Sequence, residues 1–357
     1  MNPLLAAKGL GQRIWLDNLS RELLAGPLAQ LIAQDGLAGV TSNPAIFQKS
    51  ISAGLGYAED LARLKTQALT AEQRFEALAV PDVRAACDLF ADTYRASNGL
   101  DGYVSLEVSP ALARDGAGTL AAAKRLWGAI DRPNTMIKIP ATPESLPAFT
   151  AAIAAGINVN VTLMFGPQHC DAVFEAYCTG LRQRFAAGLP VNGIRSVASL
   201  FLSRVDTHID KRLDALGGDA LALRGKAAVA LARTVYRQWM ARWASDECTD
   251  LRAAGANIQR LLWASTGTKN PAYSDVLYVD SLVGADTVNT LPDATLAAFR
   301  DHGTASTQLT VGLDEAQATI AALAALGISL DQVAEQLQVE GLQLFNEAFD
   351  KLLALLD

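Results

Sequence analysis

The chain has 357 residues, of which 50% are hydrophobic and 19% charged, and its formal net charge at pH 7 is −7. This length fits one large α/β barrel or two ordinary domains. The negative charge disfavours general affinity for nucleic acid. No apolar stretch reaches about 18 uncharged residues, so we expect no transmembrane helix and no membrane partner. The N-terminus also lacks the basic start and sustained apolar run of a signal peptide.

Cysteine and histidine usage narrows the class of protein further. The four cysteines form no CxxC pair, and the three histidines show no metal-type spacing such as HxxxH. Sparse cysteines favour reduced thiols over disulfides or a zinc site, which is typical of cytoplasmic proteins. We therefore expect a cytoplasmic protein without a metal site.

The first part of the chain contains two candidate strands and a long helical region. A strand is expected at Arg13–Asn18, followed by a helix that runs to about Gln34. Gly36–Pro44 has the composition of a turn, a short strand and a stop. Residues 58–97 show largely helical spacing of apolar residues, and Pro81 is expected to begin a second helix there.

The rest of the chain alternates more regularly between strands and helices. Gly102–Val108 is a strand in which alternation places Tyr103, Ser105 and Glu107 on one face. Beyond the last predicted strand the pattern is helical as far as Leu356. The further strands, separated by helical segments, are expected at Thr135–Pro140, Ile157–Leu163, Gly193–Phe201, Asn257–Ser265 and Val276–Val279.

This order of elements predicts the fold class. Alternating β and α segments indicate a parallel sheet, and eight such units indicate a (β/α)8 barrel, or TIM barrel, of the α/β class. A doubly wound sheet is the alternative. No linker rich in proline, glycine or serine divides the chain. We therefore expect a single barrel domain over residues 1–357 with a helical extension over about 310–357.

Polar side chains lie at or near the ends of the predicted strands. In an α/β barrel the catalytic groups gather at the C-terminal ends of the strands. A purely structural origin would scatter such residues, so their position indicates an active site. They are Asp17, Asn43, Glu107, Lys138, Thr162, Ser199 and Ser265.

Lys138 lies within the apolar run TMIKIPAT of residues 135–142. A buried strand normally excludes an ammonium group, because its desolvation is costly. An amine held away from water gives up its proton more readily, and the free amine forms a Schiff base with a ketone or aldehyde. The alternative is a lysine whose stem packs while its head reaches solvent.

Schiff-base chemistry moves protons and therefore needs carboxylates nearby. Asp17 and Glu107, from two other strand ends, are the candidates: one would act on a substrate hydroxyl and the other would handle a water. The alternatives are a helix N-cap for Asp17 and an ion pair with a structural arginine for Glu107.

Two regions have the features of an anion site. Ser199 and Arg204 bring together a hydroxyl, a guanidinium and a helix N-terminus. Residues 265–269 form a hydroxyl-rich turn after the seventh strand, where barrels frequently bind phosphate, with an ordinary polar loop as the alternative. By contrast, residues 116–121 match only a loose GxGxxA nucleotide pattern and are interpreted as the loop and cap before a helix.

Seven stretches of the chain match one family in order. They are WLDNLSR (15–21), GVTSNPAIF (39–47), SLEVSP (105–110), MIKIPAT (136–142), NVNVTLMF (158–165), SLFLSRVD (199–206) and WASTGTKNP (263–271). With TSNP and IKIPAT as the most diagnostic, the sequence resembles the transaldolases, specifically their longer bacterial subgroup.

This resemblance implies a TIM barrel that transfers a dihydroxyacetone unit in the non-oxidative pentose phosphate pathway. The donor would be sedoheptulose 7-phosphate and the acceptor glyceraldehyde 3-phosphate. The products would be erythrose 4-phosphate and fructose 6-phosphate. Because the iminium nitrogen serves as the electron sink, the reaction requires no metal and no cofactor.

The resemblance also implies catalytic roles, residue by residue. Lys138 matches the Schiff-base lysine of the family. Asp17 matches the aspartate that exchanges a proton with the C4 hydroxyl of the donor. Glu107 and Thr162 match the pair that holds a catalytic water.

Substrate-binding residues follow in the same way. Asn43 matches an asparagine that binds a hydroxyl of the three-carbon unit, and Ser199 is similar in placement to a serine that does the same. Arg204 matches the phosphate-binding arginine. Many shorter transaldolases have a serine and an arginine two apart after the seventh strand. Here the nearest cation after Ser265 is Lys269, which we expect to replace that arginine.

Two other functions stay open. A fructose-6-phosphate aldolase of the same lysine-dependent kind releases dihydroxyacetone without an acceptor, although such relatives are usually much shorter. A non-catalytic sugar-phosphate-binding barrel would keep Arg204 and Ser265 but would not need Lys138. The helical tail from Leu330 either covers the barrel or forms a subunit interface, so we expect a homodimer by resemblance, with a monomer as the alternative.

Overall fold

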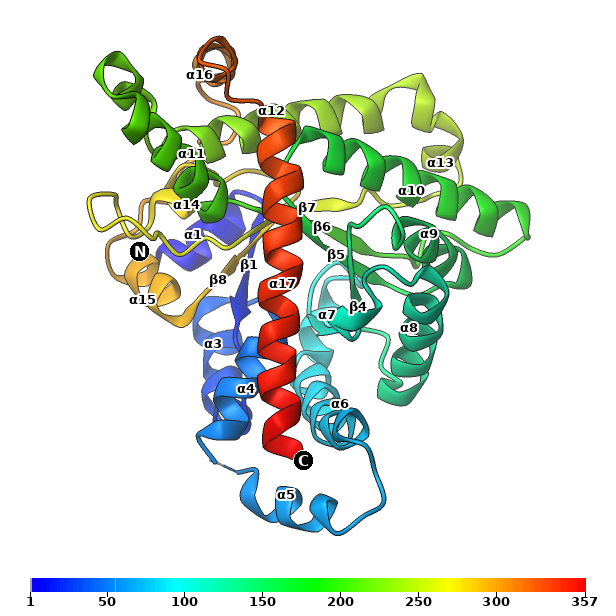
Figure 1. The fold of residues 1–357 in the computed structure, drawn as a ribbon. Helices are drawn as coiled ribbons and strands as arrows, with labels where there is room; N and C mark the ends of the chain where they lie inside the picture. Colours follow the sequence, from blue (N-terminus) through cyan, green and yellow to red (C-terminus); the bar gives the residue numbers. More distant parts are fainter. Residues whose placement is uncertain (1, 55) are drawn as a thin grey trace.

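Eight parallel strands close into a barrel in which each strand pairs with the next along the chain and β8 pairs with β1 (Figure 1). The computed structural model describes residues 2–54 and 56–357. The TIM barrel predicted from the alternation of elements is confirmed. The strands are β1 (Gln12–Asp17), β2 (Gly39–Thr41), β3 (Tyr103–Glu107), β4 (Thr135–Pro140), β5 (Val159–Met164), β6 (Ser196–Phe201), β7 (Arg260–Ala264) and β8 (Thr287–Leu291).

Helices surround the barrel and also cover one end of it (Figure 1). The helical tail predicted from Leu330 matches an observed helix at Leu330–Leu356. The α-helices are α1 (Pro3–Gly9), α2 (Arg21–Leu24), α3 (Pro27–Asp35), α4 (Pro44–Ser52), α5 (Ala58–Lys65), α6 (Ala71–Leu89), α7 (Ala91–Ala96), α8 (Gly116–Ile130), α9 (Leu146–Ala155), α10 (Pro167–Ala186), α11 (Ser203–Leu216), α12 (Ala227–Ala244), α13 (Thr249–Ala253), α14 (Leu277–Asp280), α15 (Asp293–His302), α16 (Leu313–Ala325) and α17 (Leu330–Leu356). The 3₁₀ helices are η1 (Pro110–Leu112), η2 (Gly218–Leu223) and η3 (Asp246–Cys248).

The prediction of an eighth strand at Val276–Val279 is wrong. The short helix α14 occupies this segment, and β8 lies at Thr287–Leu291, where the sequence pattern predicts helix. A four-residue apolar run does not by itself distinguish a strand from a buried helical turn. The strand character of β8 comes from its pairing with β1 and β7, which is a tertiary contact.

The prediction that Pro81 begins a helix is also wrong, because Pro81 lies inside α6. A proline in a helix interior removes a hydrogen bond and typically costs about 3 kcal/mol. The helix nevertheless continues, because its apolar stripe stays buried on both sides of the proline, at Leu78 and Ala79 and then at Val83 and Ala86. Tertiary burial here outweighs the local preference of one residue.

The interior of the barrel is filled in layers along its axis. Near the N-terminal ends of the strands, Asp101 pairs with Arg13 at 2.6 Å and with Arg260 at 3.1 Å. The last layer, at the C-terminal strand ends, is polar and contains the predicted site residues. The middle layer is apolar and includes Trp15, Tyr103, Met136, Val197, Leu262 and Val288.

The last helix, α17, lies across the C-terminal end of the barrel (Figure 1). It contacts α4 and α6 on one side of the barrel and α10 and α11 on the other. Its buried side includes Val333, Leu337 and Leu352. Gly341 lies inside the helix, where an added Cβ would come 3.1 Å from the side chain of Leu163. Of the two roles considered for the tail, the structure shows the covering of the barrel.

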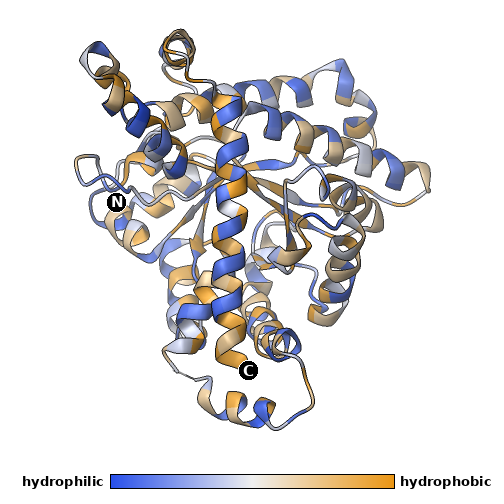
Figure 2. Ribbon diagram, in the orientation of Figure 1, coloured by the Kyte–Doolittle hydropathy of each residue, from blue (hydrophilic) through white to orange (hydrophobic). Residues whose placement is uncertain are grey.

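Hydrophilic and hydrophobic residues alternate along α17, and its last turns are hydrophobic (Figure 2). This pattern fits a helix with one side on the barrel and the other exposed. Within the described residues, no single helix is long and apolar enough to cross a membrane. Of the helices in the described part of the chain, only α16 and α17 taken together reach that length and composition, and they are bent by 83° relative to each other.

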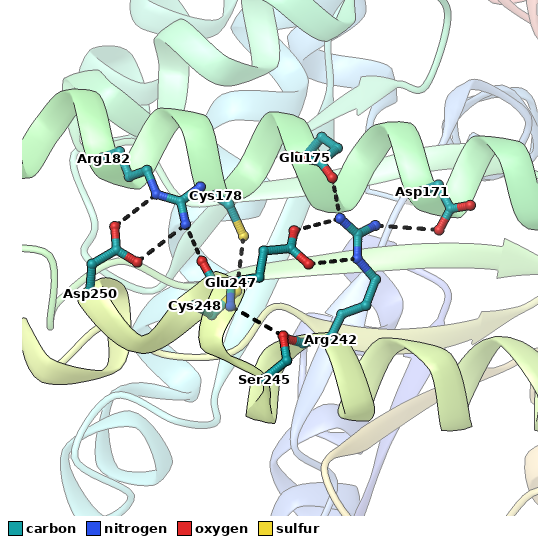
Figure 3. A network of polar contacts seen from close by, with 9 residues as sticks. All are labelled: Asp171, Glu175, Cys178, Arg182, Arg242, Ser245, Glu247, Cys248 and Asp250. Atoms are coloured by element: carbon teal, nitrogen blue, oxygen red, sulfur yellow. Dashed lines mark hydrogen bonds and ion pairs between the residues drawn. The ribbon is translucent and has the colours of Figure 1, made fainter.

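A charged network holds α10 against α12 and α13 (Figure 3). Arg242 lies among three carboxylates, and Arg182 pairs with Asp250 at 2.8 Å. Beside them, Cys178 and Cys248 are buried free thiols with their Sγ atoms 3.8 Å apart. Exposed ion pairs are worth about 0–1 kcal/mol each. The network therefore fixes the geometry of these helices more than it adds stability.

Asp206 connects three helices beside the barrel. On α11, it accepts hydrogen bonds from the backbone N–H of Ala228 on α12 and from the hydroxyl of Tyr278 on α14, both at 2.8 Å. Its carboxyl group is buried. This burial raises the pKa of Asp206 to about 6, although both hydrogen bonds oppose the rise. The carboxyl group of Asp206 is therefore protonated over a wider pH range in the folded state than in the unfolded state.

Packing in the barrel predicts the effect of a substitution at Gly39. An added Cβ there would lie 2.6 Å from the buried ring of Trp15. Gly39→Ala should lower the free energy of unfolding by about 1–3 kcal/mol, because the surrounding layer cannot yield easily. Denaturant unfolding measures this change. The control is Gly128→Ala on an exposed turn of α8, where the new Cβ would meet no described atom within 4 Å outside the adjacent residues and the local helix backbone. Here helix propensity should raise the free energy of unfolding by roughly 0.5–1 kcal/mol. Equal effects would contradict the packing at Gly39.

The burial of Asp206 predicts a pH dependence of stability. Its pKa is raised from 3.8 to about 6 on folding, so the folded state binds more protons than the unfolded state over this range. Asp206 therefore contributes about 3 kcal/mol to the free energy of unfolding below pH 4. This contribution is lost as the pH rises to about 6.

Unfolding of Asp206→Asn, measured from pH 4 to 7, should lack this loss, because the amide does not ionise. The free energy of unfolding of the wild type, minus that of the variant, should thus fall as the pH rises from 4 to 7. Asp350→Asn, on the exposed side of α17, serves as the control and should follow the wild type. Parallel curves for all three proteins would contradict the raised pKa.

Candidate active site

A pocket opens at the C-terminal end of the barrel, beneath α17. It contains about 560 Å³ of empty space, including its mouth. Glu107 lies directly beside it, with Oε2 3.5 Å from Nζ of Lys138. The structure therefore brings together residues that are up to 248 positions apart, from Asp17 to Ser265. Seven residues predicted from the sequence line this pocket: Asp17, Asn43, Lys138, Thr162, Ser199, Arg204 and Ser265.

The amine of Lys138 is fixed at the floor of the pocket. Lys138 is 5% exposed, and its Nζ donates a hydrogen bond to the carbonyl oxygen of Ser42 at 2.8 Å. The hydroxyl of Ser42 in turn donates to the carbonyl of Ser105 at 2.8 Å, which fixes the segment after β2 against β3. The alternative of a lysine that reaches solvent does not apply, because the head group is held by backbone inside the barrel.

Glu107 on β3 and Thr162 on β5 lie on either side of the strand that carries Lys138. Strand register places Glu107 opposite Lys138, and their 3.5 Å separation is an ion-pair distance rather than a short hydrogen bond. Burial raises the pKa of Glu107, while Lys138 lowers it. Among the described residues, neither Glu107 Oε2 nor Thr162 Oγ1 has a hydrogen-bond partner. Two such buried atoms beside an amine are suited to hold a water.

Asp17 ends β1 and points toward the same pocket. Its carboxylate accepts a hydrogen bond from the Thr41 hydroxyl at 2.8 Å, and that hydroxyl lies 2.9 Å from the hydroxyl of Thr290. Burial raises the pKa of Asp17, and Lys138 and Thr41 lower it. The alternative role of Asp17 as an N-cap does not apply, because Ser20 caps the next helix. A partly buried carboxylate with a raised pKa is suited to take up and return a proton.

Asn160 on β5 was not singled out in the sequence but lies at the centre of a chain of hydrogen bonds. The hydroxyl of Ser199 donates to Asn160 Oδ1 at 2.7 Å, and Asn160 Nδ2 donates to the hydroxyl of Ser105 at 3.2 Å. Ser199 therefore commits its proton and keeps its lone pairs to accept a bond from a ligand hydroxyl. The sequence does contain a signal for Asn160: alternation along β5 places it on the same strand face as Thr162.

Asn43 lines the pocket at the start of α4. Its Oδ1 accepts a hydrogen bond from the backbone N–H of Ile46 at 3.0 Å, so the residue also acts as the N-cap. Since the oxygen is committed to the cap, its NH₂ group is the part that remains to bind a ligand.

Arg204 and Ser265 form the polar wall of the pocket at the start of α11. The guanidinium of Arg204 lies over the ring of Phe201 at 5.8 Å, and burial lowers its pKa. Ser265 has a left-handed backbone, with φ of 55°, and its hydroxyl lies 2.9 Å from that of Ser203. The N-terminus of α11 has no side-chain cap. A guanidinium, hydroxyls and an uncapped helix N-terminus together favour an anion such as phosphate.

The structure does not bring Lys269 into this pocket. Lys269 is exposed and lines a separate pocket beside α11, together with Asp210, Asp214 and Arg224. Its position therefore does not support the expectation that it replaces a phosphate-binding arginine. Arg204 supplies the guanidinium of the active-site pocket.

Aromatic and hydroxyl groups complete the pocket. Phe345 reaches it from α17, and Thr290 from the strand β8 that the sequence pattern does not predict. Neither residue carries a local signal, because both owe their place to tertiary contacts. Phe345 makes the covering helix a part of the site.

Comparison with known proteins agrees with this geometry. The sequence model of the family described as transaldolase/fructose-6-phosphate aldolase matches residues 14–356. A transaldolase of Thiobacillus denitrificans is 52% identical over 347 residues, which cover 97% of each chain. A transaldolase of Neisseria meningitidis is 52% identical over 348 residues, also 97% of each chain. Transaldolase 1 of Streptomyces coelicolor is 50% identical over 347 residues, covering 96% of this chain and 91% of that protein. This chain belongs to the transaldolase/fructose-6-phosphate aldolase family.

Proposed function

We propose that this protein is a transaldolase that moves a dihydroxyacetone unit from sedoheptulose 7-phosphate to glyceraldehyde 3-phosphate. The products are erythrose 4-phosphate and fructose 6-phosphate, as in the non-oxidative pentose phosphate pathway. The observation that carries the proposal is the buried amine of Lys138, with Glu107 at 3.5 Å, in a barrel pocket that also contains Asp17 and Arg204. The relatives of similar length that are named transaldolase support transfer over simple cleavage.

Schiff-base formation is the first step. The free amine of Lys138 adds to the C2 ketone of the donor, and the carbinolamine then loses water to give an iminium ion. Proton transfer in these steps is assigned to a water held between Glu107 and Thr162. The raised pKa of Glu107 favours this role, because the carboxylate accepts a proton more readily.

Cleavage of the carbon–carbon bond follows. Asp17 takes the proton of the C4 hydroxyl, the C3–C4 bond breaks, and its electron pair moves into the iminium group to leave a three-carbon enamine on Lys138. The released aldose phosphate then leaves the pocket. The raised pKa of Asp17 helps this step, because the proton must stay on the enzyme until it is needed again.

Transfer to the acceptor reverses these events. C3 of the enamine attacks the carbonyl carbon of glyceraldehyde 3-phosphate, and Asp17 returns its proton to the new C4 hydroxyl. Water then hydrolyses the iminium ion and frees Lys138, with Glu107 again handling the proton. No net proton is gained or lost by the enzyme over the cycle.

The remaining pocket residues bind the sugar phosphate. Asn43 and Ser199 are assigned to hydroxyls of the three-carbon unit, and Arg204 and Ser265 to the phosphate. Lys269 is left out of this assignment, because it lines another pocket. A homodimer and a cytoplasmic location stay predictions, as does the interpretation of residues 1–357 as one catalytic domain.

Borohydride trapping tests the Schiff base directly. With fructose 6-phosphate as the donor and no acceptor, reduction should leave a three-carbon adduct on Lys138, because the enamine is in equilibrium with a reducible iminium ion. Peptide mass spectrometry locates the adduct. Lys138→Arg keeps the charge but lacks the nucleophilic amine, so it should yield no adduct and no turnover.

The same assay separates the alternatives. If dihydroxyacetone is released as fast without an aldose acceptor as the donor is consumed with one, the protein is an aldolase and not a transferase. Binding of fructose 6-phosphate without any adduct on the wild type would leave only a sugar-phosphate-binding barrel.

Phosphate binding is tested at Arg204. Loss of hydrogen bonds to a charged group costs about 1.5–3 kcal/mol, so Arg204→Ala should raise KM for the phosphorylated donor by roughly 10–100-fold. Lys269→Ala is the matched cation control and should change KM less than about twofold, because Lys269 lies outside the pocket. Steady-state kinetics with both variants decides the point. A larger effect at Lys269 than at Arg204 would reverse the assignment.

A further inference from the structure

Gln338 is a buried polar residue on the barrel-facing side of α17. It is 8% exposed, and its Nε2 donates hydrogen bonds to the carbonyl oxygens of Ala141 at 3.0 Å and Leu163 at 3.1 Å. Ala141 directly follows β4, the strand of Lys138, and Leu163 directly follows Thr162. One amide from the covering helix therefore binds the ends of the two strands that carry Lys138 and Thr162.

The backbone that Gln338 binds on β5 is irregular. Leu163 has a φ of 61°, which is unfavourable for a residue with a branched side chain. The pairing of β5 with β6 shifts its register between Val161 and Met164. Such a conformation persists only where its surroundings hold it. Gln338 supplies one of these restraints through the Leu163 carbonyl.

The two strand ends and Gln338 form a continuous hydrogen-bonded unit. The backbone N–H of Ala141 donates to the carbonyl of Thr162 at 2.8 Å, and the next carbonyls of both strands bind Gln338. The amide thus extends the β4–β5 ladder by one step. A displacement of α17 at this point is transmitted to the backbone on which Thr162 and Lys138 are mounted.

The same side of α17 contacts the pocket at two further positions. Gly341, one turn after Gln338, allows close approach: an added Cβ would lie 3.1 Å from Leu163 and 3.5 Å from Nη1 of Arg204. Phe345, one turn further, lines the pocket itself. Residues at this spacing lie on one face of a helix, so Gln338 is the polar anchor of the face that covers the site.

We propose that Gln338 is a positioning residue for the transfer reaction. Through the carbonyls of Ala141 and Leu163 it holds Lys138 and Thr162 at the separation that Schiff-base formation and hydrolysis require. The role rests on the proposed function. A misplacement of catalytic groups by about 1 Å lowers rates by up to about a hundredfold, so a loss of this restraint affects the chemical step rather than substrate binding.

Gln338→Met tests the proposal, because methionine keeps the length and burial of the side chain but donates no hydrogen bond. The donor KM should change less than threefold, while kcat and the rate of borohydride-trappable adduct formation at saturating fructose 6-phosphate should fall roughly 10–100-fold. The matched control is Gln343→Met on the exposed side of α17, where the Gln343 amide donates a hydrogen bond to Glu347 on the same helix, and it should match the wild type.

A second variant separates positioning from simple attachment of the helix. Leu337→Ala weakens the packing of α17 but leaves the Gln338 amide in place. Amide hydrogen exchange reports how firmly α17 is attached in each variant. If the two variants lose the same protection of the α17 amides from hydrogen exchange, Gln338→Met should still form the adduct at least tenfold more slowly than Leu337→Ala.

Two results would overturn the role of Gln338. One is an unchanged adduct rate in Gln338→Met, with only a lower melting temperature. The other is an equal loss of rate in Gln338→Met and Leu337→Ala at equal protection. Absence of any adduct on the wild-type Lys138 would instead refute the proposed function, so the two failures are distinguishable.

Discussion

Burial of the Lys138 amine is the constraint on which the rest of the site depends. Lys138 is 5% exposed, so its amine has little contact with water, and a buried ion costs several kcal/mol unless it is paired. The carbonyl of Ser42 at 2.8 Å and the carboxylate of Glu107 at 3.5 Å offset this cost in part. Because one acceptor is backbone and the other belongs to the neighbouring strand, the barrel itself defines where the proposed nucleophile lies.

Strand register determines which groups surround the amine. The pairings of β3 with β4 and of β4 with β5 place Glu107, Lys138 and Asn160 side by side. Inward residues earlier on these strands, such as Met136 two positions before Lys138 and Tyr103 four positions before Glu107, belong to the apolar layer beneath. That layer closes the pocket on the N-terminal side, so the polar groups face only toward α17. The chemistry is therefore mounted on rigid strands, which favours a fixed geometry.

Local sequence patterns predict the residues at the strand ends better than they predict the helix and loops that lie over those ends. Alternation assigns Glu107 to one face of its strand, the apolar setting of Lys138 favours a buried amine, and parallel strands bring both residues to one end of the barrel. Gln338 and Phe345 have no comparable signal, because a long amphipathic helix does not reveal which element its apolar side covers. For Lys269, the distance along the chain from β7 does not specify on which side of α11 the loop falls, so its place outside the active-site pocket was not predictable.

The proposed reaction must keep an enamine from water and still admit a second sugar, and α17 covers the pocket in which both would take place. Phe345 joins the helix to the pocket, and Gln338 joins it to the ends of β4 and β5. If the helix moves far enough to admit bulk water, it also releases the strand ends that carry Lys138 and Thr162. With Gln338 in its proposed role, the open state is thus the less reactive one. Hydrolysis of the intermediate, which needs both water and aligned proton-transfer groups, is disfavoured in the state where water has the easiest access.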